Sequence, residues 1–157
     1  MVPLSVMLTV LAVFGGQNIA QKTGTIVVYR ERGKNFGLIH YGEGEHPTIY
    51  CDGIKVARLR ESHRVTVSAS VGPHDCVALE KQYPTELNVD SHKVSIEVKA
   101  NGTTYLRLQV PWGHTHFLLQ EIPAETASAE SAKMQPAATS DSYNSVLPVT
   151  AGEKPSQ

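Results

Sequence analysis

Short runs of hydrophobic and β-branched residues alternate with groups of turn-forming residues between residues 24 and 122. Inside several runs the hydrophobic and polar positions alternate with a period of two. Residues 64–71 show this pattern clearly, with Val65, Val67 and Val71 set among polar or small neighbours. A period of two is typical of a strand that buries one face. We therefore expect about eight short strands, drawn from ten candidate runs at residues 25–30, 36–41, 47–51, 54–59, 64–71, 76–79, 86–89, 94–99, 104–110 and 117–122.

Turn residues separate these runs. Asp52-Gly53 lies between two hydrophobic runs and predicts a hairpin, because a type I′ turn needs positive φ at both central positions. Asn101-Gly102 predicts a second hairpin, and Gly72-Pro73 is expected to end the strand that precedes residues 76–79. No window has hydrophobic residues at a helical spacing with caps over more than two turns. The pattern predicts an all-β fold, a single β-sandwich of Greek-key or barrel-like form, over residues 24–122.

The two ends of the chain differ from this middle. Residues 1–21 carry no charged side chain, and residues 4–14 are almost wholly hydrophobic. The length predicts a signal peptide over residues 1–20, since a membrane span needs roughly 20 apolar residues. The alternative is an uncleaved anchor formed by residues 2–20. After cleavage we expect no membrane span, and either interpretation places the domain outside the cytoplasm, in the periplasm or secreted.

At the other end, Ala, Ser, Thr, Pro and Glu dominate residues 124–157. Such a composition buries too little apolar surface to offset the entropy of ordering, so this tail is expected to be disordered. Tyr143, Val146 and Leu147 form a small hydrophobic group that could be a docking motif or simply part of a solvated tail.

Cys51 and Cys76 are the two cysteines. An even count in an exported chain favours a disulfide, and the alternative is two buried free thiols. Lys and Arg number 14 and Asp and Glu 15, so the chain lacks the strongly basic balance of a general nucleic-acid binder.

Candidate chemistry is sparse. His114 and His116 would share one face of a strand, a spacing that can chelate zinc or copper, with His74 or His92 as a third ligand; the alternative is two solvent-facing loop histidines. Tyr105, Arg107 and Trp112 could line a ligand surface on a sheet face, although Tyr105 could equally belong to the core. No serine or cysteine sits in a recognisable nucleophile motif, and no cofactor motif is present.

The middle of the chain resembles a family of bacterial envelope proteins known as domain of unknown function 2846. The resemblance covers roughly residues 24–122 and rests on residues 49–57, on Gly72-Pro73-His74 and on residues 101–107. It implies a small envelope β-domain with no established activity and no catalytic residues. The expected function is therefore an exported, non-enzymatic module that binds a protein or glycan of the cell envelope. A metal-binding or metal-sensing protein is the alternative, and a small hydrolase is a third, weaker one.

Overall fold

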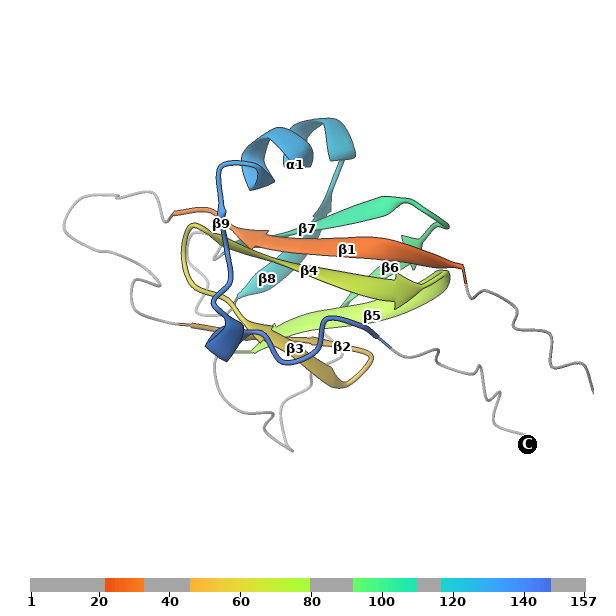
Figure 1. Ribbon diagram of the computed structural model, residues 1–157, viewed down its shortest axis with the longest axis horizontal. Coiled ribbons are helices and arrows are strands. Elements are labelled where there is room, and N and C mark those ends of the chain that lie inside the picture. Colours follow the sequence, from red (N-terminus) through yellow and green to blue (C-terminus); the bar gives the residue numbers. More distant parts are fainter. Residues whose placement is uncertain (1–21, 33–45, 80–91, 110–116, 148–157) are drawn as a thin grey trace, which may run out of the picture.

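The computed structural model describes residues 22–32, 46–79, 92–109 and 117–147, and its strands form two sheets (Figure 1). The first sheet has the order β8-β7-β1-β4-β9 and the second the order β3-β2-β5-β6. The strands are β1 (Thr23–Arg30), β2 (Thr48–Cys51), β3 (Ile54–Arg58), β4 (His63–Ser70), β5 (Gly72–Leu79), β6 (Val94–Val98), β7 (Thr103–Gln109), β8 (Leu118–Ile122) and β9 (Gln135–Pro136). The sheets do not close into a barrel among these residues, so the expected all-β, sandwich-like fold is confirmed.

The core lies between the two sheets and follows from the alternation within each strand. In β4, Val65 and Val67 are buried and lie opposite Val28 and Ile26 of β1. Val71, which the pattern placed on the same face, follows the end of β4 and is 44% exposed. The buried cluster takes side chains from both sheets, including Leu106 and Leu108 from β7 and Ile49, Val56, Ala78, Ile96 and Val98 from the second sheet.

The Asp52-Gly53 hairpin is confirmed. Asp52 and Gly53 have φ values of 52° and 75°, and they join β2 to its antiparallel neighbour β3. The strand expected over residues 64–71 ends as predicted, because β4 stops at Ser70, but the next strand, β5, begins at Gly72 and not at Cys76. Gly72 allows this sharp reversal through a φ of 131°.

The turn at Asn101-Gly102 is present, with Asn101 at a φ of 55°, but the expected hairpin is not. β6 belongs to the second sheet and β7 to the first, so the turn carries the chain from one sheet to the other. β7 then runs parallel to β1, which lies between β7 and β4. The expected strands at 36–41 and 86–89 lie outside the described residues.

The expectation of a disordered tail is wrong for residues 124–147. The helix α1 (Ala124–Ser131) covers the outer face of the first sheet, where Ala127 packs with Tyr29 and Ile122. Residues 135–147, here called the strap, then run along the side of the sandwich formed by β4 and β3 and contain the 3-10 helix η2 (Thr139–Asp141) (Figure 1). Residues 148–157 lie outside the described part of the chain.

The strap is held mainly by main-chain hydrogen bonds. It pairs with β4 at Gln135 and Pro136, crosses to β3 at Ser142, and returns to β4 at Val146. One side chain anchors it in the core, because Leu147 is only 3% exposed and belongs to the buried cluster. The sequence of the strap shows no alternation or periodicity that would predict a strand or helix. Its order therefore comes from pairing with the edges of two sheets.

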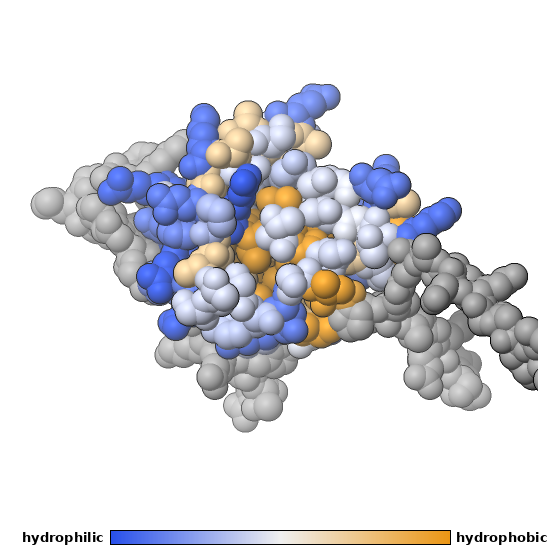
Figure 2. Space-filling model, in the orientation of Figure 1, coloured by the Kyte–Doolittle hydropathy of each residue, from blue (hydrophilic) through white to orange (hydrophobic). Residues whose placement is uncertain are grey.

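Few large hydrophobic side chains are exposed on the described part of the molecule, namely Val71, Tyr143 and Val146. Figure 2 shows one face, where hydrophobic atoms are visible in a limited area between α1 and the strap. No helix in the described ranges is long and apolar enough to cross a membrane. The expected signal peptide, residues 1–20, lies outside these ranges.

Candidate functional site

A cleft of about 390 Å³ lies on the side of the sandwich opposite the strap. It is bounded by the end of β6, the start of β7, the end of β8 and the first residue of α1. The lining is mostly polar and of mixed charge, with Glu97, Lys99, Thr103, Tyr105 and Glu121, and has an apolar part formed by Ile122, Pro123 and Ala124. The crossover at residues 99–102 creates this side, because it brings the edge of the second sheet next to β7 of the first. This volume falls in the range of small-molecule sites.

Tyr105 and Arg107 point to the same face of β7, as the alternation predicted, but they have different surroundings. Both are half-buried on the outer face of the first sheet. Tyr105 packs against the cluster of Tyr29, Ile122 and Ala127 and lines the cleft. The core and ligand-surface interpretations of Tyr105 therefore each describe part of its environment.

Arg107 lies beneath α1 and contacts Glu130 of that helix, with Nη1 at 3.5 Å from the carboxylate. Glu130 also accepts a hydrogen bond of 2.5 Å from the hydroxyl of Tyr29, the residue paired with Arg107 across β1 and β7. Burial, together with the Glu130 carboxylate, raises the pKa of the Tyr29 hydroxyl. The tyrosine therefore stays protonated and donates, and this pair fixes α1 to the sheet.

Trp112, His114 and His116 lie outside the described residues, so the ligand-binding and metal hypotheses for them stay predictions. Within residues 22–32, 46–79, 92–109 and 117–147, no group of three or more His, Cys, Asp and Glu side chains is placed to hold a metal ion.

The disulfide between Cys51 and Cys76 is confirmed. The two cysteines are directly opposite each other in the antiparallel pair of β2 and β5, and their Cα atoms are 4.1 Å apart. Both are almost fully buried, with 1% and 0% exposure. The bridge therefore joins the two central strands of the second sheet from inside the core.

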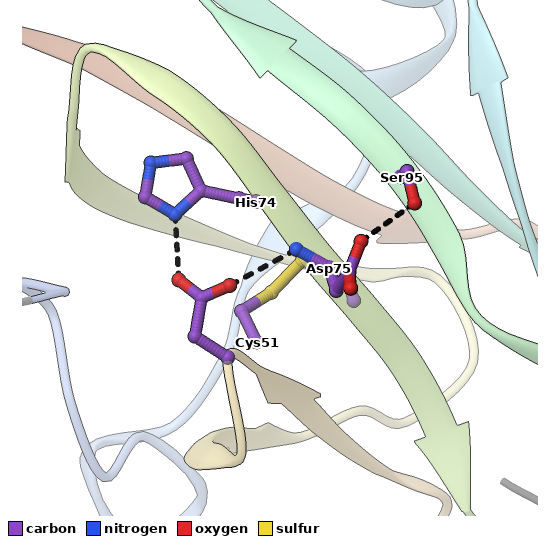
Figure 3. Close-up of a disulfide and its surroundings, with 6 residues drawn as sticks. Cys51, His74, Asp75 and Ser95 are labelled. Atoms are coloured by element: carbon purple, nitrogen blue, oxygen red, sulfur yellow. Dashed lines mark hydrogen bonds and ion pairs between the residues drawn. A yellow bond between two sulfur atoms is a disulfide. The ribbon is translucent and has the colours of Figure 1, made fainter. Parts of the chain in front are cut away.

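A buried polar network adjoins this disulfide (Figure 3). His74 is 2% exposed and points to the same face of β5 as Cys76. Its Nδ1 lies 2.6 Å from Oδ2 of Asp52, the residue that follows Cys51. Its Nε2 lies 2.8 Å from the carbonyl oxygen of Ser70, at the end of β4. The other carboxylate oxygen of Asp52 accepts a hydrogen bond of 3.0 Å from the backbone N–H of Asp75.

Both ring nitrogens of His74 thus face oxygen acceptors, and each must carry a proton to donate. Burial disfavours the charged ring, but the hydrogen bonds to Asp52 and to the Ser70 carbonyl outweigh it and raise the pKa of His74 above its usual value. His74 thus connects a turn to the end of a strand from inside the fold, with an oxygen atom at each ring nitrogen.

The set Asp52, His74 and Ser70 contains the residue types of a hydrolytic triad, and sequence reasoning missed its proximity. The geometry differs from a working triad. A triad histidine needs an unprotonated Nε2 to accept the serine proton. Here Nε2 donates to the Ser70 carbonyl, and the Ser70 hydroxyl is more distant at 3.4 Å. A signal was available: once Cys51 pairs with Cys76 in antiparallel register, Asp52 lies opposite Asp75 and next to His74.

Comparisons of the chain with protein-family models, with curated proteins and with solved structures find no match. The resemblance to the envelope family 2846 therefore stays a prediction. The class shown is a disulfide-linked, two-sheet β-sandwich-like domain with a C-terminal strap.

Proposed function

We propose that the chain is a non-enzymatic binding module of the cell envelope and that the cleft beside Tyr105 takes a glycan. The observation that carries this proposal is the polar, mixed-charge lining around one aromatic side chain. Carboxylates accept hydrogen bonds from sugar hydroxyls, and lysine and threonine can donate them. Tyr105 offers an apolar surface with a polar tip for a sugar ring.

The size of the cleft is consistent with a small glycan. A volume of about 390 Å³ lies near the lower end of the range of small-molecule sites and accommodates one or two sugar rings.

Two further observations support the absence of catalysis and the location outside the cytoplasm. The histidine of the Asp52-His74-Ser70 set has both nitrogens engaged as donors, which leaves no general base at Ser70. The buried disulfide fits an oxidising compartment, because such bridges are rare in the cytosol.

The proposal is tested by binding to a glycan array, followed by NMR titration with the best oligosaccharide. We expect the largest amide shifts at residues 97–105 and 121–124. Tyr105→Ala should weaken binding by up to about tenfold, since an aromatic stacking contact contributes about 0.5–1.5 kcal/mol beyond its area.

Tyr143→Ala is the matched control, because Tyr143 is an exposed tyrosine of the strap, 45% accessible and away from the cleft. It should bind the glycan as the wild type does. Shifts confined to the strap side, or equal loss in both variants, would contradict the assignment of the cleft.

A further inference from the structure

The buried histidine next to the disulfide has a role that the cleft does not require. His74 is the one link in the described network that joins three separate parts of the chain: the Asp52-Gly53 turn, its own strand β5 and the end of β4. Each of the two contacts is short, at 2.6 and 2.8 Å, and each requires a proton on the ring. Removing that proton turns one donor into a lone pair that faces an oxygen atom.

The position of this link relative to the disulfide is specific. Asp52 follows Cys51 directly, and its backbone N–H donates to the carbonyl of Asp75, the residue before Cys76. The Asp52 carboxylate accepts from the N–H of Asp75 and from His74. The contacts that keep the turn against β5 therefore lie immediately beside the two sulfur atoms (Figure 3).

We propose that His74 is a pH-dependent latch over the Cys51–Cys76 disulfide. In the protonated state the latch holds the Asp52-Gly53 turn closed and shields the bridge from reductants. When the ring loses its proton, one of its nitrogens presents a lone pair to the Asp52 carboxylate or to the Ser70 carbonyl, and that contact becomes repulsive. The turn then opens more often, and a thiol reaches the disulfide.

The charges around the ring support this order of events. Asp52 faces His74 from the turn, and Glu97 of β6 adds a favourable field. Asp75, on the same strand, is engaged elsewhere, because its carboxylate accepts a hydrogen bond of 2.6 Å from Ser95 of β6. The described surroundings of the ring are thus anionic or neutral, and they retain the proton until the pH rises past the usual value for histidine.

The chemical step is ordinary thiol–disulfide exchange. A thiolate of dithiothreitol attacks one sulfur and breaks the S–S bond to give a mixed disulfide. The second thiol of the reagent displaces the protein sulfur and closes its own ring disulfide. Two electrons pass from the dithiol to the protein, and Cys51 and Cys76 become two free thiols.

The test measures the rate of reduction of the full chain by dithiothreitol between pH 5 and pH 9. Each rate is divided by that of oxidised glutathione at the same pH, so the ionisation of the reagent cancels. For the wild type we expect this ratio to rise about tenfold or more with a single midpoint above pH 6.5, the scale of one lost charge-assisted hydrogen bond. A flat ratio would overturn the proposal.

Two variants separate the latch from general loosening. Asp52→Asn keeps an oxygen for the Asp75 N–H but removes the charge that retains the proton, so the midpoint should move to lower pH. His74→Gln should give a fast, pH-independent ratio. If His74→Gln fails to fold, comparing the midpoint of the pH dependence between the wild type and Asp52→Asn still tests the proposal. An unmoved midpoint in Asp52→Asn would overturn the proposal, because the titrating group would then not be His74.

Discussion

The two open sides of the sandwich are built in opposite ways. On one side the edges of β4 and β3 are covered by the strap, which supplies main-chain partners to both and inserts Leu147 into the core. On the other side, β6, β7 and β8 leave a polar cleft that includes charged side chains and Tyr105. On the strap side the strand edges are covered, and on the cleft side polar side chains are exposed around the cleft. The difference indicates that the strap side serves stability, whereas the cleft side carries the binding function that we propose.

The largest expected effect comes from breaking the strap side at its anchor. Leu147→Ala removes a side chain that is 3% exposed and leaves a cavity in the core cluster, so it should cost about 2–5 kcal/mol of unfolding free energy. Chemical denaturation measures this value. Val146→Ala is the matched control, because Val146 is 61% exposed, and it should change stability by less than about 0.5 kcal/mol. Equal effects at the two positions would mean that the strap is not anchored as described.

The second effect concerns α1, which connects the two sides because its first residue lines the cleft and its last turn leads to the strap. Glu130→Ala deprives the fully buried Tyr29 of the acceptor for its hydroxyl, and should cost about 1–3 kcal/mol. Glu130→Gln retains an acceptor oxygen and should recover most of the loss in the same denaturation experiment. If Gln and Ala behave alike, the Tyr29 hydrogen bond does not hold the helix.

A smaller effect is expected for the ion pair between Arg60 and the strap. Arg60 lies 2.9 Å from the Asp141 carboxylate, but its side chain is 52% exposed. Pairs this accessible contribute about 0.2–1 kcal/mol, and salt screens them. Arg60→Ala should therefore lower the melting temperature slightly, and 1 M sodium chloride should remove most of the difference. A loss that persists in high salt would show that packing, not charge, accounts for it.

The smallest effect on stability, and the sharpest contrast with the strap, is expected at the cleft. Glu121 is exposed and lines the cleft, so Glu121→Gln should change unfolding free energy by less than about 0.5 kcal/mol. Glycan affinity should fall by severalfold, because the amide is a weaker acceptor than the carboxylate. Calorimetric titration and denaturation of one sample measure both. A marked loss of stability would make Glu121 part of the scaffold.

The strand content and the strongest turn could be predicted from local patterns. Val65 and Val67 alternate with polar residues because one face of β4 is buried, and Asp52-Gly53 has the residues that positive φ requires. The pairing of β6 and β7 could not be predicted in this way. Asn101-Gly102 suits a hairpin, but whether the following strand stays in the same sheet depends on contacts with β1, far away in sequence.

The strap and the histidine network could not be predicted from local patterns either, because both depend on tertiary contacts. The composition of residues 124–147 predicted disorder, whereas the order of the strap arises from two sheet edges that only the assembled sandwich provides. His74 has no distinctive neighbours in sequence, and its role becomes visible only when Cys51 and Cys76 define the register. Of the expected site residues, Tyr105 lines the cleft and Arg107 lies under α1, an arrangement that requires the helix to be known.

The parallel pairing of β1 with β7 has a consequence for the time course of folding. β1 is the earliest strand described, yet one of its two neighbours is made about eighty residues later. During synthesis from the N-terminus, β1 can pair with β4 before β7, the neighbour on its other edge, has been made. Loop-closure entropy makes such distant pairings slow. The second sheet draws three of its strands from residues 48–79 and carries the disulfide, so we expect it to form first and the β1–β7 seam to be the late, rate-limiting step.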